Sequence, residues 1–436
     1  METIAIIADD LTGASDTAIQ FRKYGLKTMV IVDYQDLEGA SRGIPVWSIN
    51  ADTRPLTAAE AYERIYAITQ KLKDMKFNRI YKKIDSTLRG HPGAELEAVM
   101  DALKAELALV VPAFPANGRA VVNGCLVVHP SKNTGGGEEL FPTGALEGDL
   151  VHVPTLLQKE MRRRVGGVAL DKVRAGEAEL IHAIKALREQ GQEVLVIDAV
   201  TEEDMEEIAA ACSALPMEVT LAGAAGLASH LPAAWRLDLG DKEKVAKKEG
   251  TLLVVAGSRN PVSAAQVEEL LKATGAPLVE VDTENIKSGL GEQEVERAVK
   301  EATRWLGEPQ PCSLLVVAVD SLIRRETPET SLAEEGVKYG KTIAEALGEM
   351  VRRLVGLGSV RGLVVTGGDV AVHICRALGV KGIELIAELL PGIPLGKCLG
   401  GEVDGLPVVT KAGGFGPPDA FVRVVEYLKD PTRVIN

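Results

Sequence analysis

Hydrophobic and polar positions follow two recurring patterns along the chain. Short runs of β-branched and other apolar residues, typical of buried strands, alternate with longer segments in which apolar residues recur at i, i+3 and i+4. The helical period is clear in 58–73 and 293–306. The apolar runs predict strands at 3–8, 27–32, 45–49, 79–84, 107–111, 193–197 and 219–221, and then at 251–256, 278–281, 314–319, 362–366, 384–387 and 407–410.

Repeated strand–helix units indicate parallel sheets covered by helices on both faces. The chain has 436 residues, which is too long for a single core. Its rhythm breaks at 232–250, a stretch that begins with proline and ends in charges of mixed sign. We therefore predict an α/β protein of two domains, 1–235 and 250–436, each a mainly parallel sheet flanked by helices. The active site is expected in the crevice between the two domains. Residues 129–148, rich in Gly, Pro, Ser and Thr, predict a long loop in the first domain.

Composition excludes several classes of protein. The net charge of −13 argues against a nucleic-acid partner and against an anionic membrane surface. The five cysteines are odd in number and lack metal-ligand spacing, so we expect buried thiols, no protein-held metal centre and a reducing compartment. Met1 leads directly into the first apolar run, and no run is long enough to cross a bilayer. These features predict a cytoplasmic protein.

The most informative stretch follows the last expected strand. The strand ends at Lys411, and the loop 412–416 and two prolines come next. The three glycines of this loop leave backbone N–H groups unobstructed and permit positive φ, so the loop can fold around an anion. Pro417 and Pro418 suit the first turn of a helix, whose N-terminus attracts phosphate, and the lysine adds a positive charge. The candidate phosphate-binding residues are Lys411, Gly413, Gly414, Phe415 and Gly416.

Two further glycine turns follow expected strands in the same half of the chain. Gly367 and Gly368 precede Asp369, whose carboxylate could cap the next helix or bind Mg²⁺ beside a nucleotide. Ser258 lies in the turn 257–261. Each turn alone is also explained as an ordinary strand–helix connection, but three together indicate a nucleotide site at the carboxyl edge of a parallel sheet.

Polar residues also follow the expected strands of the first half. Asp9 and Asp10 come directly after strand 3–8, where they point toward a ligand crevice or, alternatively, cap a helix. Strand alternation places Lys83 and Asp85 on one face, so a cation and a carboxylate share one patch. Lys and Arg suit a small carboxylate ligand, Ser and Thr suit its hydroxyls, and Asp suits proton abstraction. A surface loop with a salt bridge is the alternative. His91 is the one histidine inside this dense motif, and Arg54 could add another carboxylate-binding group.

Six segments in order, ADDLTGASD, KKIDSTLRGH, PAFPANGR, GSRNPVSAAQ, TGGD and KAGGFGPPDAF, resemble the four-carbon acid sugar kinase family over essentially the whole chain. The resemblance implies an ATP-dependent kinase of threonate, erythronate or 3-oxo-tetronate, with an N-terminal substrate domain and a C-terminal nucleotide domain. Two departures are visible. Val370 follows the GGD segment where the family usually has Thr or a similar residue, and 129–148 lacks an Asp-Pro pattern that many members share.

The resemblance also implies site residues. On the substrate side they are Asp9, Arg54, Lys83, Ile84, Asp85 and Ser86, to which the motif itself adds Arg89. On the ATP side they are Ser258, Gly367, Gly368, Asp369, Gly413, Gly414, Phe415 and Gly416.

These observations together give a hypothesis of phosphoryl transfer from ATP, with Mg²⁺, to the terminal hydroxyl of a four-carbon sugar acid. Lys411 and the glycine loop would hold the phosphates, while Lys83 and Arg54 would bind the substrate carboxylate. Asp10 or Asp85 would orient or deprotonate the attacking hydroxyl. A non-catalytic sugar-acid sensor is the main alternative, and a nicotinamide-dependent dehydrogenase is a weaker one because its glycine fingerprint is missing. The expected partners are the sugar acid and ATP, with a homodimer left open.

Overall fold

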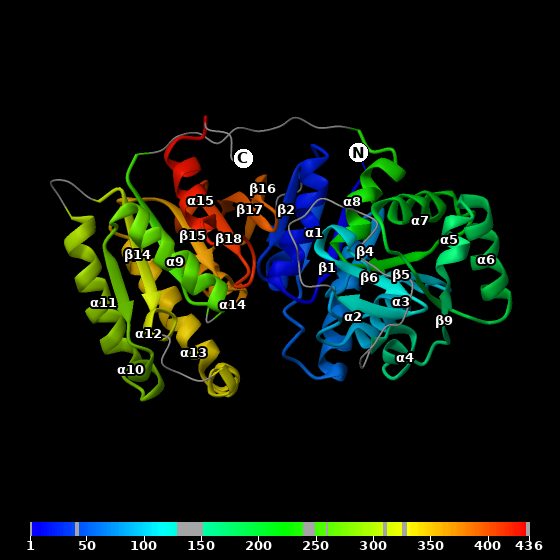
Figure 1. Cartoon of the computed structure of the whole chain (residues 1–436), viewed down its shortest axis with the longest axis horizontal. Coiled ribbons are helices and arrows are strands. Elements are labelled where there is room, and N and C mark those ends of the chain that lie inside the picture. Colours follow the sequence, from blue (N-terminus) through cyan, green and yellow to red (C-terminus); the bar gives the residue numbers. More distant parts are fainter. Residues whose placement is uncertain are drawn as a thin grey trace. The chain divides into compact units, whose positions relative to one another are not determined.

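The computed structural model describes residues 2–39, 43–128, 151–238, 249–258, 260–307, 312–324 and 329–432 (Figure 1). Two compact units emerge. The first contains Met1–Thr28 and Arg42–Gly240, and the second contains Met29–Ser41 and Asp241–Asn436. The linear division into 1–235 and 250–436 therefore differs in one segment, because Met29–Ser41 groups with the second unit. The expected loop 129–148 and Arg259 lie outside the described residues.

The first unit is built on a parallel sheet. Within the described residues its strand order is β3 (Val46–Asn50), β1 (Ile4–Ala8), β4 (Arg79–Lys83), β11 (Thr220–Gly223), β5 (Ala108–Val111), β10 (Val194–Ile197) and β9 (Val165–Val168). Every residue of β1 is buried, as expected for a strand covered on both faces. A small antiparallel sheet of β6 (Arg119–Val122), β7 (Cys125–Val128) and β8 (Val151–His152) was not predicted.

Helices of the first unit cover this sheet around a continuous apolar core that includes Phe21, Tyr81 and Leu109. They are α1 (Leu11–Lys23), α2 (Ala58–Asp74), α3 (Pro92–Leu103), α4 (Val153–Gln158), α5 (Leu170–Arg174), α6 (Glu177–Glu189), α7 (Glu202–Ala214) and α8 (Ala225–Ala234), with a short 3-10 turn at Pro115–Asn117. The 3-10 turn at Tyr34–Gly39 belongs to the second unit. Helix α2 starts where its pattern predicted, because Thr57 and Glu60 form a capping box.

The second unit has a mixed sheet. Strands β13 (Leu278–Val281), β14 (Leu314–Val319), β12 (Thr251–Ala256), β15 (Val360–Thr366) and β18 (Pro407–Lys411) are parallel in this order. The sheet continues with β17 (Ile393–Leu399), β16 (Gly382–Leu390) and β2 (Thr28–Ile31), each antiparallel to its neighbour. Its helices are α9 (Pro261–Thr274), α10 (Thr283–Lys287), α11 (Gly291–Leu306), α12 (Asp320–Arg324), α13 (Glu329–Val355), α14 (Gly368–Ala377) and α15 (Ala420–Lys429), with a 3-10 turn at Gly401–Val403.

The predicted α/β class, with mainly parallel sheets flanked by helices, is confirmed. Both sheets change winding direction at their first strand: β1 has β3 on one side and β4 on the other, and β12 lies between β14 and β15. In open α/β sheets a ligand binds at such a switch point, beyond the carboxyl ends of the strands. The fold therefore directs attention to the residues that follow β1 and β12.

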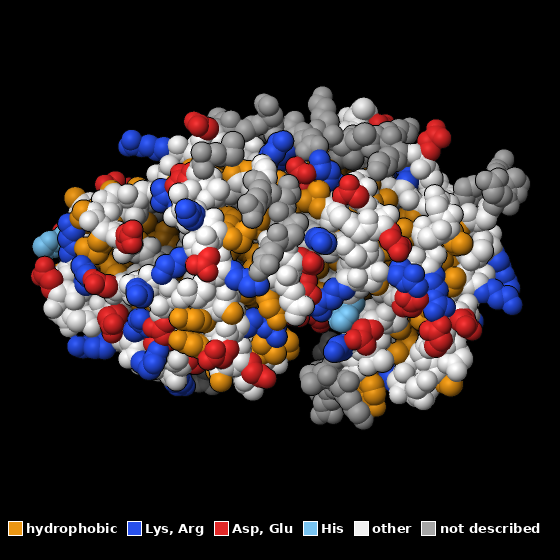
Figure 2. All heavy atoms as spheres, turned by 180° about the vertical axis from the view of Figure 1, so that it is seen from behind, with side chains coloured by type: hydrophobic (Ala, Val, Ile, Leu, Met, Phe, Trp, Pro, Cys, Tyr) orange, Lys and Arg blue, Asp and Glu red, His pale blue; other side chains and the backbone are white. Residues whose placement is uncertain are grey.

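The surface and the helices agree with the composition. Figure 2 shows basic and acidic side chains interspersed over the face that it presents. Of the helices in the described part of the chain, none is both long and apolar enough to cross a membrane.

Candidate active site

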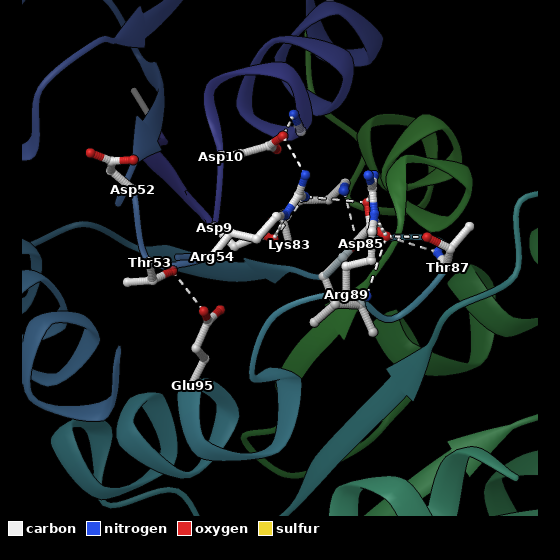
Figure 3. A network of polar contacts seen from close by, with 12 residues as sticks. Asp9, Asp10, Asp52, Thr53, Arg54, Lys83, Asp85, Thr87, Arg89 and Glu95 are labelled. Carbon is white, nitrogen blue, oxygen red and sulfur yellow. Dashed lines mark hydrogen bonds and ion pairs between the residues drawn. The ribbon is translucent and has the colours of Figure 1, made fainter. Parts of the chain in front are cut away.

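A cluster of charged side chains lies at the carboxyl ends of β3, β1 and β4 in the first unit (Figure 3). We call it the acid–arginine cluster; its members are Asp9, Asp10, Arg54, Asp85 and Arg89. Because three adjacent parallel strands end at one edge, residues 9–10, 54 and 85–89 meet although they lie far apart in sequence. These segments therefore lie close together, as the sequence pattern predicted.

Arg54 bridges the three carboxylates of the cluster. Its Nε lies 2.8 Å from Asp9 Oδ2, its NH1 2.7 Å from Asp10 Oδ2 and its NH2 3.3 Å from Asp85 Oδ1. Burial opposes the charged form, but these carboxylates outweigh it and raise the pKa of Arg54 above its ordinary value. The guanidinium faces acids of its own chain, so its clearest role in this geometry is to hold the cluster together.

The surroundings of the two candidate bases, Asp10 and Asp85, shift their pKa values in opposite directions. Burial raises the pKa of Asp10 above its ordinary value, and the charge of Asp9 raises it further, although Arg54 and Lys83 act the other way. Burial also acts to raise the pKa of Asp85. There, however, hydrogen bonds from Arg89 and Thr87, with the charge of Arg54, hold the pKa well below its usual range. A raised pKa suits a proton acceptor, so the electrostatics favour Asp10.

Asp10 also begins helix α1, where its Oδ1 accepts a hydrogen bond from Gly13 N at 2.7 Å. The capping interpretation is therefore correct, and it coexists with membership of the cluster because Oδ2 faces Arg54. The side chain of Asp10 is 27% exposed, whereas that of Asp9 is only 3% exposed. Asp10 is thus the more accessible of these two acids.

Asp9 has one carboxylate oxygen with no hydrogen-bond partner among the residues that the structure describes. Its Oδ2 accepts from Arg54, while its Oδ1 is buried and accepts no hydrogen bond from the described residues. A buried, unpaired carboxylate oxygen is costly unless a donor reaches it. A ligand hydroxyl could supply that donor, which supports the prediction of Asp9 as a substrate-binding residue.

Residues 83–89 are the third segment that contributes side chains to the acid–arginine cluster or its surroundings. Lys83 is buried, and its Nζ donates to the carbonyl of Ile84 at 2.7 Å. Arg89 binds Asp85 through two hydrogen bonds of 2.9 and 2.8 Å, while its side chain is 64% exposed. Ser86 is half-buried. Arg89 is therefore the cation of this segment that an incoming carboxylate reaches most readily.

His91 has a structural position. Its ring lies 3.1 Å from a carboxylate oxygen of Glu160 through Nδ1 and 2.7 Å from the carbonyl of Leu56 through Nε2. Both ring nitrogens are engaged at the start of helix α3, so His91 ties this helix to two neighbouring segments.

A buried ion pair beneath the cluster was not predicted. Lys82 Nζ lies 2.7 Å from Glu95 Oε2, and both side chains are at most 2% exposed. Glu95 Oε1 accepts from Thr53 Oγ1 at 2.6 Å, immediately before Arg54 in the chain. The pair thus anchors the segment that carries the bridging arginine, through the contact between Thr53 and Glu95 that Figure 3 shows. A lysine within a strand expected to lie in a sheet covered by helices on both faces was the available signal.

In the second unit, the three glycine turns meet at the carboxyl ends of β12, β15 and β18. Gly257 N donates to Thr366 O at 3.3 Å, and Gly367 N donates to Lys411 O at 3.0 Å. A methyl group on Gly413 would lie 2.1 Å from Ser258 Oγ, so only glycine allows this approach. The predicted grouping of these turns at one edge of the sheet is therefore present.

Several local expectations about these turns are wrong. Of the three loop glycines, only Gly416 has a positive φ, of 82°, so Gly413 and Gly414 are not needed for backbone conformation. Helix α15 begins at Ala420, after the two prolines rather than with them. Asp369 lies in the first turn of α14, is exposed and caps nothing; the N-cap is Gly367.

Lys411 also differs from its expected orientation. It is 3% exposed, and its Nζ donates to the carbonyl oxygens of residues 412, 413 and 415 at 2.7, 3.0 and 3.0 Å. Burial lowers its pKa to about 7. Its ammonium therefore points into the loop rather than away from it.

Comparison with known proteins agrees with this division of chemistry. Residues 4–231 match the family model of a sugar-binding N-terminal domain, and residues 253–421 match that of a nucleotide-binding C-terminal domain. Crystal structures of a Salmonella typhimurium LT2 protein and of Haemophilus influenzae protein HI1011 share the fold, with TM-scores of 0.78 and 0.71 at 24% and 23% identity. They cover 97% and 98% of this chain, and 99% and 100% of their own. The chain thus combines a sugar-binding domain with a nucleotide-binding domain, the two parts that a sugar kinase requires.

The curated relatives are kinases of four-carbon acids. The chain is 32% identical to the D-threonate kinase of Salmonella typhimurium (98% of each chain). It is also 32% identical to the D-erythronate kinase of Heliobacterium modesticaldum and to the 3-oxo-tetronate kinase of Pseudomonas fluorescens, covering 98% of this chain and 97% of each relative. The chain belongs to the four-carbon acid sugar kinase family, and it is a sugar acid kinase that transfers a phosphoryl group to a hydroxyl.

Proposed function

We propose that the protein transfers the γ-phosphoryl group of MgATP to the terminal hydroxyl of threonate, erythronate or 3-oxo-tetronate, giving the 4-phosphate. The observation that carries this proposal is the acid–arginine cluster at the switch point of the first sheet. It combines an accessible carboxylate of raised pKa, a buried carboxylate oxygen that receives no hydrogen bond from the described residues and an exposed arginine. These groups match, in turn, a reacting hydroxyl, a second hydroxyl and a carboxylate.

The roles of the substrate-side residues follow from their contacts. Asp10 accepts the proton of the terminal hydroxyl, while Asp9 accepts a hydrogen bond from another hydroxyl through Oδ1. Arg89 binds the acid's carboxylate, and Lys83 adds positive charge nearby. Arg54 fixes the positions of the three carboxylates relative to one another. Proximity and orientation of the reacting groups then supply much of the rate enhancement.

The nucleotide side lies in the second unit, at the meeting point of the three glycine turns. Backbone N–H groups here bind the phosphates, and the N-terminus of α14 adds its favourable dipole. Mg²⁺ needs only one or two protein carboxylates because ATP and water supply its other ligands, and exposed Asp369 fits that requirement. The bound ion would neutralise charge on the transferring phosphoryl group.

A substrate panel tests the proposal. We expect ATP consumption with at least one of D-threonate, D-erythronate and 3-oxo-tetronate, and a phosphomonoester at C4 by ³¹P and ¹³C NMR. Five-carbon acids and neutral tetroses serve as controls. Turnover of the neutral sugars at equal kcat/KM, or of none of the acids, would contradict the proposed substrate class.

Gly413→Ala should raise the KM for ATP about tenfold, because overpacking costs about 1–3 kcal/mol and the added methyl meets Ser258 Oγ. The KM for the acid should change little. Gly340→Ala is the matched control, since a methyl group there, in α13, meets nothing within 4 Å. Steady-state kinetics with each substrate varied in turn measure both values, and unchanged ATP kinetics in a folded Gly413→Ala variant would exclude this turn from the nucleotide site.

A further inference from the structure

The loop after β18, residues 412–417, is held from beneath by buried side chains. Lys411 Nζ donates to the carbonyls of residues 412, 413 and 415 at 2.7–3.0 Å. Among the ion pairs of the described residues, none joins this ammonium to a carboxylate. Its positive charge is therefore solvated by the loop's own carbonyl oxygens.

Helix α9 supplies two more side chains that contact the loop from beneath. Gln266 Nε2 lies 2.9, 3.0 and 2.9 Å from the carbonyl oxygens of residues 415, 416 and 417, and this glutamine is fully buried. Ser263 Oγ donates to the carbonyl of Gly413 at 2.8 Å and is also fully buried. Together with Lys411, these side chains turn the carbonyls of residues 412, 413, 415, 416 and 417 inward.

The inward carbonyls fix the direction of the amides. In a trans peptide the N–H of one residue points away from the carbonyl of the residue before it. Inward carbonyls at 412, 413 and 415 therefore turn outward the N–H groups of Gly413, Gly414 and Gly416. Within the described residues, these three N–H groups donate no hydrogen bond. The next two residues are prolines, which have no N–H.

We propose that Lys411, Gln266 and Ser263 are positioning residues: they hold the loop carbonyls inward so that three glycine N–H groups bind the nucleotide phosphates. This inference rests on the proposed function. Lys411 acts here without contacting phosphate, contrary to its expected role as a phosphate ligand. Its ammonium is enclosed by the loop, and burial has lowered its pKa to about 7, as expected for a group shielded from solvent. The phosphate-binding groups are therefore backbone N–H groups of the loop, and the side chains beneath the loop determine its conformation.

Gln266 separates this proposal from a direct role of the lysine charge, because a neutral buried amide beneath the loop cannot serve as a phosphate-binding charge. ATP affinity is measured by calorimetry on the full chain for wild type, Lys411→Met, Gln266→Leu and the double variant. Each single change removes several hydrogen bonds to the loop and should weaken ATP binding about tenfold. The double variant should lose less than the product of the two effects, since both act on one loop.

Thr274→Ala provides the matched control at the far end of α9, where the hydroxyl donates to the carbonyl of Leu270 and accepts from Ala276 N, away from the loop. It should bind ATP like wild type, and the KM for the acid should be unchanged in every variant that folds. Wild-type affinity in Gln266→Leu together with a loss in Lys411→Met would overturn the proposal and favour a direct role of the charge.

A second measurement uses the wild-type protein alone and so does not depend on whether the variants fold. Amide hydrogen exchange at Gly413, Gly414 and Gly416 should slow when ATP or tripolyphosphate binds, and should not respond to adenosine. ATP binding that leaves all three amides unprotected overturns this inference while the proposed function stands. Absence of ATP binding to the wild type overturns both.

Discussion

Asp10→Asn should lower kcat by about 10²–10⁴-fold, the usual contribution of general acid–base catalysis. Asparagine retains a side-chain oxygen that can cap helix α1, so the fold and the KM for ATP should be preserved. The change removes the proton acceptor and leaves the rest of the acid–arginine cluster in place. Stopped-time assays at saturating ATP and acid measure the loss.

The pH profile gives an independent check on the same residue. A base works only when deprotonated, so kcat/KM should fall as the pH falls through the raised pKa of Asp10, above the ordinary aspartate value of about 3.9. Asp85, with its lowered pKa, stays ionised across this range. Asp171→Asn, a change at an exposed acid of α5, should leave the profile unaltered. Retention of kcat in Asp10→Asn with its loss in Asp85→Asn would assign the base to the other carboxylate.

Lys82→Met should destabilise the first unit by about 3–5 kcal/mol, because it leaves Glu95 as a buried carboxylate without its ammonium. Lys82 Nζ also donates to the carbonyls of Ile7 and Lys83, so the ends of β1 and β4 lose a shared contact. Urea unfolding followed by circular dichroism measures the change.

The double variant Lys82→Met with Glu95→Gln should recover part of this loss, since no buried charge remains unpaired. Lys159→Met, at an exposed lysine of the same unit, should alter stability by less than about 0.5 kcal/mol. If Lys82→Met is as stable as the Lys159→Met control, the Lys82–Glu95 ion pair makes no net contribution to the stability of the first unit.

Features with a strong local signal were predicted well. Helices 58–73 and 293–306 agree with α2 and α11 to within two residues, because their apolar period is unambiguous. The strand ends that carry the candidate residues were also placed correctly, since buried parallel strands read as short apolar runs. Strands β6, β7, β8, β9 and β17 were missed. Of these, β9 contains two glycines and β17 contains Pro394 and Gly396, which weaken the strand pattern.

Side-chain direction could not be predicted, because it depends on partners distant in sequence. The pattern grouped Lys83 with Asp85 but could not show that Arg89 and Thr87 would hold Asp85 in its ionised form. Gln266 and Ser263 look like ordinary residues of the buried face of α9. Only the folded chain brings them beneath a loop about 150 residues further on.

The pairing of strand β2 with β16 has a consequence for folding during synthesis of the chain. Residues Met29–Ile31 of β2 pair with Glu384–Gly382 of β16, so an early segment of the nascent chain must wait for more than three hundred residues before its partner emerges. Such distant pairing slows folding and leaves the edge of β2 able to recruit a foreign strand until β16 emerges. A recombinant second unit starting after residue 249 would lack this strand. To produce the nucleotide-binding unit alone, residues 27–41 should be supplied as a separate peptide or joined to the C-terminus through a linker.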